Sequence, residues 1–223
     1  MAFTTRLAKV REALVAAECD ALVSLSAPAN AYMTGFFGST SAVVITEEEA
    51  LFLCDFRYTE QANEQVQGYT VQEEKGALET RAAEYLNSFG VKRVALDSTA
   101  HTLYQYETIT RTFEGELVSE PTLLAGLRMI KDASEIELLR GATDLAEGVL
   151  HDLLPELTEG ILERELAAQF VYEFKRRGAS GPSFDPMALF GSHSSLPHGM
   201  PGDRALKSGD IVLLDFGCVL NGY

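Results

Sequence analysis

The chain has 223 residues, of which 46% are hydrophobic and 23% are charged, and its formal net charge at pH 7 is −15. These proportions are typical of a soluble globular protein with one large domain or two small ones. The acidic side chains are scattered and would repel a polyphosphate, so we exclude nucleic acid as a partner. No apolar run approaches the roughly 18 residues that span a bilayer, and no secretory signal precedes the first amphipathic segment. We therefore expect a cytoplasmic protein that does not enter a membrane.

The three cysteines, Cys19, Cys54 and Cys218, are far apart and odd in number. They form neither a Cys-x-x-Cys pair nor a pattern with the spacing of zinc ligands. We expect reduced thiols with a structural role.

The first half of the chain has the pattern of an α/β domain. Apolar residues at steps of four and three predict a helix from Phe3 to Ala17. Short apolar runs predict strands over residues 21–25, 42–46, 51–54 and 91–96. Three glutamates join the second and third of these strands as a hairpin. Helical segments alternate with the strands, an order typical of layered α/β architecture.

The pattern breaks near Glu120-Pro121, and we place a domain boundary after residue 126. Beyond it, Asp132 and Glu135 have the spacing of a capping box at the start of a helix. The apolar stripe of this helix is expected at Ile136, Leu139, Thr143, Ala146 and Leu150. A second helix is predicted by Leu162, Leu166, Phe170 and Phe174, and Gly178 is placed to end it.

Asp215 is the most informative single residue. Four apolar residues precede it, so its carboxylate is expected at or near a buried strand. A charge there is costly unless it is paired or bound to a metal. The alternative is an Asp that caps the turn at Gly217. The tripeptide Asp215-Phe216-Gly217 also occurs in protein kinases, but no Gly-rich loop, strand lysine or His-Arg-Asp motif precedes it, so we exclude a kinase.

Two of the four histidines, His193 and His198, lie in a Pro- and Gly-rich loop just before the strand that carries Asp215. Loops that hold a titratable group in a fixed shape are frequent sites of catalysis. Taken alone, each is equally compatible with an ordinary loop histidine. His101 and His151 lie in mostly polar helical segments, and we expect them on the surface.

A series of short motifs follows one order along the chain. In the second half these are Gly181-Pro182-Ser183-Phe184-Asp185-Pro186, Leu196-Pro197-His198-Gly199, residues 209–217 and Gly222-Tyr223. In the first half they are Tyr32-Met33-Thr34-Gly35-Phe36, Asp55-Phe56-Arg57-Tyr58 and residues 128–132. In order and spacing the series resembles the pita-bread metallopeptidases, specifically the Xaa-Pro aminopeptidase and prolidase branch. Several motifs in the correct order are specific, whereas one alone would be weak.

The resemblance implies two domains and an activity. Residues 1–126 would form a creatinase/prolidase-type α/β domain, and residues 127–223 would form an incomplete pita-bread α+β catalytic domain. The substrate would be a proline-containing peptide, cut at the bond before proline. The nitrogen of that imide carries no hydrogen, so general aminopeptidases handle it poorly. The family also implies a homodimer.

The resemblance further implies a centre of two divalent metal ions held by two aspartates, one histidine and two glutamates. Carboxylate-rich ligation of this kind suits manganese, with zinc or cobalt as substitutes. Asp215 matches the first aspartate. His198 matches a histidine that binds no metal but hydrogen-bonds the substrate and the developing tetrahedral intermediate. No such role falls on His193, which we expect to tolerate alanine.

The chain departs from the family pattern at its end. By family spacing the second aspartate lies about eleven residues beyond Asp215, which falls past Tyr223. One carboxylate cannot hold two ions, because affinity grows with ligand number and charge. We therefore expect this chain to be a fragment of a longer gene product, without a pair of bound ions and inactive by itself.

Two other classes remain open. Pita-bread domains also occur as pseudoenzymes that bind proteins after losing metal ligands, and such members are often acidic, as this chain is. A metal-free hydrolase of the creatinase kind would share both domains.

Overall fold

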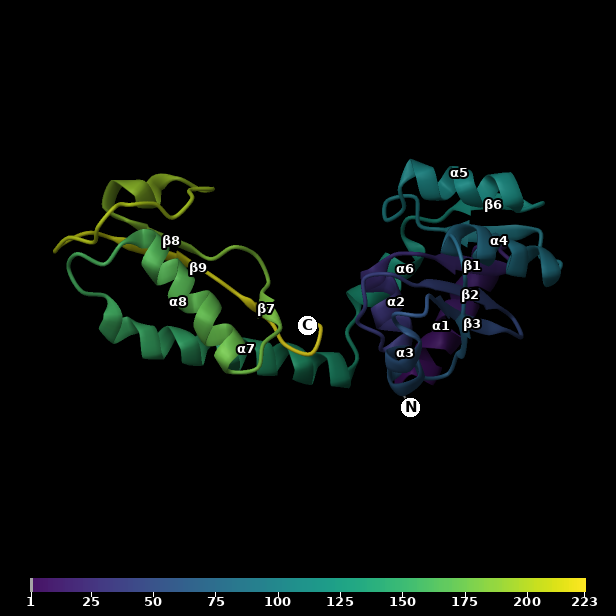
Figure 1. Cartoon of the computed structure of the whole chain (residues 1–223), viewed down its shortest axis with the longest axis horizontal. Coiled ribbons are helices and arrows are strands. Elements are labelled where there is room, and N and C mark those ends of the chain that lie inside the picture. The colour runs from purple at the N-terminus through teal and green to yellow at the C-terminus, as the bar shows by residue number, and fades with distance from the viewer. Residues whose placement is uncertain (1) are drawn as a thin grey trace. The chain divides into compact units, whose positions relative to one another are not determined.

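The computed structural model describes residues 2–223, which divide into two compact units (Figure 1). Unit 1 ends at Ile130, and unit 2 begins at Lys131. No helix in the described part of the chain is both long and apolar enough to cross a membrane. Cys19, Cys54 and Cys218 are buried and free.

Unit 1 is built around a mixed six-stranded sheet in the order β4-β3-β2-β1-β5-β6. The strands are β1 (Ala21–Ser24), β2 (Ala42–Thr46), β3 (Ala50–Cys54), β4 (Thr70–Glu73), β5 (Arg93–Leu96) and β6 (Glu116–Ser119). β2 is antiparallel to both β1 and β3, whereas the other neighbouring pairs are parallel. The hairpin of β2 and β3 confirms the sequence prediction.

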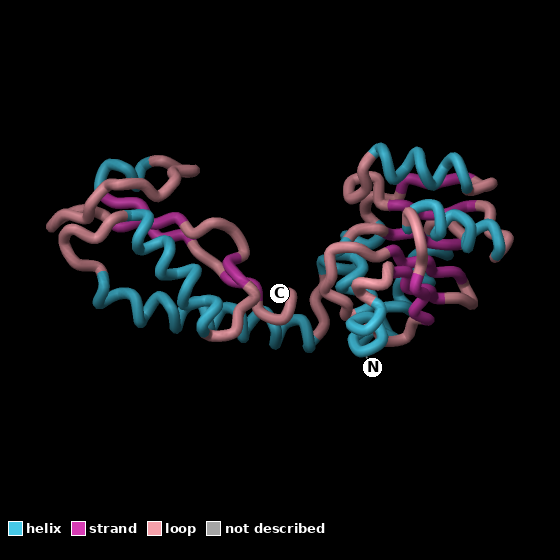
Figure 2. Tube along the Cα trace, viewed as in Figure 1, coloured by secondary structure: helices cyan, strands magenta, loops and turns pink. Residues whose placement is uncertain are grey.

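Helices cover both faces of this sheet (Figures 1 and 2). They are α1 (Ala2–Ala16), α2 (Ala27–Thr34), α3 (Thr59–Gln65), α4 (Leu78–Ser88), α5 (Leu103–Thr112) and α6 (Leu123–Met129). Side chains of α1, α2, α3 and α6 form a core with one face, and side chains of α4 and α5 form a core with the other. Because β1, β2 and β3 are buried on both faces, they read as continuous apolar runs.

His101 is not the plain surface residue that its polar surroundings suggested. Its Nε2 accepts a hydrogen bond of 2.9 Å from the backbone N–H of Leu25, and its Nδ1 lies 2.7 Å from the carbonyl oxygen of Asp97. Nδ1 must therefore carry the proton. The half-buried ring joins the end of β1 to the loop after β5.

Unit 2 packs two long helices against a long antiparallel pair of strand segments (Figure 2). The helices are α7 (Ala133–Leu153) and α8 (Glu163–Arg176), with short 3-10 helices η1 (Leu154–Glu156) and η2 (Gly191–Ser195). The strands are β7 (Gly181–Pro182), β8 (Met187–Phe190), β9 (Val212–Asp215) and β10 (Cys218–Val219). β8 pairs with β9 and β7 pairs with β10, both antiparallel.

The first helix begins and the second ends as expected, but the buried face of α7 is only partly the predicted one. Asp132 and Glu135 form both halves of the capping box. Gly178, at φ 95°, follows α8 with the left-handed conformation that glycine adopts most easily. The buried residues of α7 are Glu135, Ala142, Val149 and Leu153, whereas Ile136 and Leu139 are each 40% exposed. The second half of the predicted stripe is confirmed, because Ala146 and Leu150 pack against the core of unit 2. The first half is not buried, and Leu139 and Thr143 line an open hollow beside β10.

β9 is less covered than β8. Ile211 is 71% exposed, and the apolar residues of β9 are only half-buried. Among the described strands, β9 pairs with β8 alone. Asp215, expected near a buried strand, is therefore exposed.

Candidate active site

Asp215 is the last residue of β9 and lies directly opposite Met187 of β8. Directly opposed residues of an antiparallel pair project to the same face, and the faces alternate along each strand. Ala188 and Leu214, one residue further along, belong to the core formed with α8. Asp215 therefore projects to the face of the β8–β9 pair that is turned away from the helices.

An irregularity in the strand pairing follows Asp215 immediately. Four residues, 183–186, separate β7 from β8, whereas only Phe216 and Gly217 separate β9 from β10. Two extra residues thus bulge out of one strand, a feature that bends the pair and re-aims neighbouring side chains. Gly217 suits this position because a Cβ there would lie 2.5 Å from the Oγ of Ser183. The bulge consequently ends the regular pairing at the carboxylate of Asp215.

The loop that carries His198 covers the same face. Leu189 pairs with Leu213, so its side chain projects to the face of Asp215, and it is fully buried. A Cβ on Gly199 would lie 2.6 Å from the Cδ1 of Leu189, so only glycine allows the loop to approach this closely. His198, the preceding residue, is exposed. Leu189 lies two residues from Met187 along β8, or ~7 Å in strand geometry.

The loop is held at both ends by the carboxylate of Glu163, at the start of α8. Its Oε1 accepts a hydrogen bond of 2.8 Å from the N–H of Phe190, and its Oε2 accepts one of 3.0 Å from the N–H of Gly202. Nδ1 of His193 lies 3.0 Å from Oε1 and 2.8 Å from Oε2. The side chain of Glu163 is completely buried.

Burial raises the pKa of Glu163, but the hydrogen bonds from Phe190, Gly202 and His193 outweigh it and hold the pKa below its ordinary value. The carboxylate is therefore ionised and can only accept hydrogen bonds, so Nδ1 of His193 must be the donor. An ion pair lies nearby, in which Nη2 of Arg204 is 3.4 Å from Oδ1 of Asp210. This pair fills the space that a Cβ on Gly191 would take, at the start of the loop.

His193 makes contacts that its sequence context did not indicate. Its ring is half-buried and donates to a buried carboxylate, so replacing it would leave a charge without one of its partners. Glu163 was missed altogether. The signal was present, because Glu163 precedes Leu166, Phe170 and Phe174 at steps of three, four and four, on the buried stripe of the helix.

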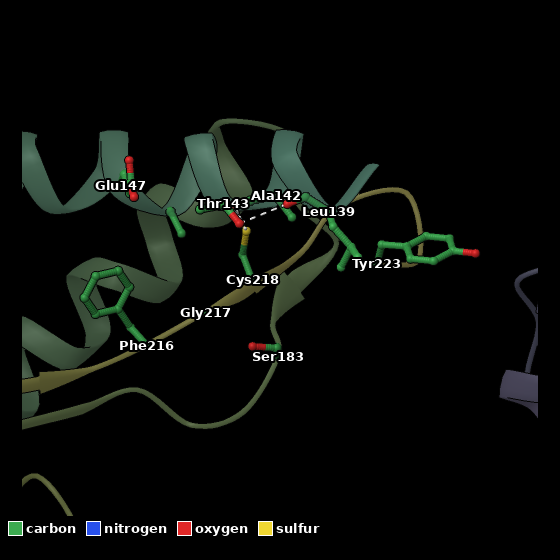
Figure 3. Close-up of a pocket in the computed structure, with 10 residues that line it drawn as sticks. Leu139, Ala142, Thr143, Glu147, Ser183, Phe216, Gly217, Cys218 and Tyr223 are labelled. Carbon is green, nitrogen blue, oxygen red and sulfur yellow. Dashed lines mark hydrogen bonds between the residues drawn. The ribbon is translucent and has the colours of Figure 1, made fainter. Parts of the chain in front are cut away.

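A hollow on the helix side of the strands is separate from this arrangement. Figure 3 shows Cys218 pointing toward α7, with its thiol directed at the carbonyl oxygen of Ala142 at 3.4 Å. Burial raises the pKa of the Cys218 thiol, which favours an unreactive, structural role. Glu147, Thr143 and Tyr223 lie around the rim.

Within residues 2–223, no group of three or more His, Cys, Asp or Glu side chains is arranged to hold a metal ion. Asp215 offers one exposed carboxylate, which fits a single ligand of a carboxylate-rich centre. The described residues by themselves do not form a two-ion site.

The chain thus has an α/β domain followed by a second unit of two helices and paired strands, and a family model matches each. The Creatinase/Prolidase N-terminal domain matches residues 6–130, and Metallopeptidase family M24 matches residues 137–223. The chain belongs to the creatinase/prolidase family of the pita-bread superfamily, and it is similar to proteins named Xaa-Pro dipeptidase.

Three relatives illustrate the likeness. The uncharacterized peptidase YqhT of Bacillus subtilis is 36% identical over 98% of this chain and 62% of its own length. The solved structure of an Xaa-Pro dipeptidase from Bacillus anthracis is 28% identical with a TM-score of 0.94, over 99% of this chain and 62% of that one. That of an X-Pro aminopeptidase from Thermotoga maritima is 28% identical with a TM-score of 0.87, over 94% and 61%. The chain thus spans about three fifths of the relatives it matches.

Proposed function

We propose that this chain supplies the amino-terminal domain and the first part of the catalytic domain of an Xaa-Pro peptidase. Its relatives include proteins named Xaa-Pro dipeptidase and X-Pro aminopeptidase. The observation that carries the proposal is that Asp215 and the His198 loop share one face of the β8–β9 pair. A carboxylate and a histidine-bearing loop on one face of a strand pair suit a hydrolytic site.

In this proposal Asp215 is the first carboxylate ligand of a centre of two divalent ions. Manganese is the preferred metal, and zinc or cobalt could replace it. The bound ions would supply Lewis acidity and an activated water. His198, at the exposed tip of the loop, would donate a hydrogen bond to the scissile carbonyl oxygen as negative charge develops on it. Asp215 is the last paired residue of β9, so the regular pairing with β8 ends at this position.

The alternatives differ in what they need from this face. A protein-binding pseudoenzyme would neither catalyse hydrolysis nor bind metal. A creatinase-like hydrolase would catalyse hydrolysis without a metal ion. The presence of both Asp215 and His198 favours the metallopeptidase. A homodimer in the cytoplasm is part of the proposal, and light scattering tests the oligomeric state.

The test uses the protein expressed from its natural gene. We expect it to hydrolyse a peptide with proline in the second position, to cut the matched alanine peptide far more slowly, to lose activity on chelation and to regain it with Mn²⁺. Activity that survives complete metal removal would support the creatinase-like alternative. Binding of proline peptides without hydrolysis in the presence of Mn²⁺ would support the pseudoenzyme.

A further inference from the structure

Glu163 is a buried charge whose hydrogen-bond partners all belong to one short stretch of chain. The donors are the N–H of Phe190 at the end of β8, Nδ1 of His193 in η2 and the N–H of Gly202. His198 lies between the second donor and the third. One carboxylate therefore closes the loop that carries His198, from its first residue to its last.

Glu163 itself is held firmly. It occupies the first turn of α8, and its own N–H donates to the carbonyl oxygen of Arg204 at 3.1 Å. The next residue, Arg164, donates its N–H to the carbonyl oxygen of Gly202 at 3.2 Å. Further along α8, Leu166, Phe170 and Phe174 are buried in the core of unit 2. The loop is thus tied to a helix that packing fixes in place.

The energetics favour this carboxylate as the element that sets the shape of the loop. A buried carboxylate is tolerated only when donors satisfy it, and removal of one partner costs more than the bond itself contributes. Any displacement of residues 190–202 that broke these bonds would expose an unsatisfied charge. The preferred loop position is therefore the one in which all three donors reach Glu163.

We propose that Glu163 is a positioning residue, which with His193 holds the His198 loop over the strand face that carries Asp215. This inference rests on the proposed peptidase function for its catalytic consequence. Its structural part, that the carboxylate fixes the loop, stands on the contacts alone. Neither Glu163 nor His193 need touch the substrate.

The decisive variants change the donors and the acceptor separately. Glu163→Gln keeps the size of the side chain but replaces one acceptor oxygen with a donor, which faces a backbone N–H. Glu165→Gln is the matched control, because Glu165 lies in the same helical turn, is exposed and needs only one oxygen to accept the N–H of Leu162. His193→Ala removes the imidazole donor, whereas His193→Asn retains an N–H at the position of Nδ1.

Three measurements are made on each variant. Amide hydrogen exchange over residues 190–202 reports the loop without reference to activity, and thermal unfolding identifies variants that no longer fold. Steady-state hydrolysis of a proline peptide, in the protein expressed from its natural gene and loaded with Mn²⁺, separates kcat from KM.

We expect Glu163→Gln and His193→Ala to speed exchange in this loop and to lower kcat on the order of a hundredfold, the typical effect of misplacing a catalytic group by about 1 Å. His193→Asn should restore most of kcat, and Glu165→Gln should match the wild type. Unchanged exchange in Glu163→Gln, or equal losses in His193→Asn and His193→Ala, would overturn the inference. If the wild type fails to cut proline peptides, the proposed function is wrong. The hydrogen-exchange measurement still decides whether Glu163 holds the loop.

Discussion

The hydroxyl of Tyr223 donates a hydrogen bond of 2.8 Å to Oε1 of Glu135, 88 residues earlier in the chain. Oε2 of the same carboxylate accepts the N–H of Asp132 at 2.9 Å, as half of the capping box of α7. Glu135 is almost completely buried. One carboxylate thus joins the start of the first helix of unit 2 to the segment that follows β10.

Tyr223→Phe should destabilise unit 2 because it removes a donor from the buried carboxylate of Glu135. The expected loss is about 1.5–3 kcal/mol, the range for a hydrogen bond to a charged group. Urea unfolding, monitored by hydrogen exchange of the amides of unit 2, measures this loss of stability. Tyr172→Phe is the control, because Tyr172 is 65% exposed. Equal midpoints for the two variants would show that the Tyr223 bond contributes nothing.

Gly199→Ala should displace the His198 loop. Its Cβ would lie 2.6 Å from Cδ1 of Leu189, which is fully buried and has little room to move. Overpacking of this kind costs about 1–3 kcal/mol. Gly202→Ala is the matched control in the same loop, because its Cβ would meet only Oε2 of Glu163, at 3.9 Å. Equal thermal stability of the two variants would contradict the close packing of Gly199 on Leu189.

The contribution of Glu163 should depend on pH. Hydrogen bonds hold its pKa below the ordinary value of 4.5 in the folded protein, so the unfolded chain takes up this proton first as pH falls. The ionised carboxylate therefore stabilises the fold above about pH 4.5, and this stability is lost as pH falls through the folded pKa. We expect the stability difference between wild type and Glu163→Gln to narrow between pH 6 and pH 3. A difference that stays constant or widens on acidification would contradict the lowered pKa.

Unit 2 should be cut by proteases before unit 1. The sheet of unit 1 is covered by helices on both faces, whereas the apolar residues of β9 are only half-buried. Limited proteolysis followed by mass spectrometry should place the first cuts after Gly178 and leave residues 2–120 intact. Equal protection of both regions would show that β9 is covered in solution.

Much of the fold could be predicted because local patterns were strong. The hairpin of β2 and β3, the strand β5 and the capping box at Asp132 all follow from short-range signals that the tertiary structure keeps. β4 and β6 were missed because they are short strands at the two edges of the sheet, with polar residues at their ends. An edge strand is half solvated, so its hydrophobic pattern is weak.

The candidate site was only partly visible in the sequence. The motifs point to Asp215 and His198, but nothing local to either residue reveals the bulge at residues 183–186. That bulge depends on strand pairing between distant parts of the chain, Met187 with Asp215 and Pro182 with Cys218. Glu163 could have been found as a charge on an apolar stripe. The hydrogen bond of His193 to Glu163 could not have been found, because the two residues are 30 positions apart and only the folded structure brings them together.

The most direct test of the account compares metal content and turnover in Asp215→Ala and His198→Ala, in the protein expressed from its natural gene. His151→Ala, an exposed position on α7, is the control and should behave as wild type. We predict that Asp215→Ala loses both bound metal and hydrolysis of proline peptides. His198→Ala should keep its metal while kcat falls roughly a hundredfold to a thousandfold, as for the loss of an oxyanion donor. Full metal content in Asp215→Ala, or release of metal from His198→Ala, would contradict the roles proposed for these two residues.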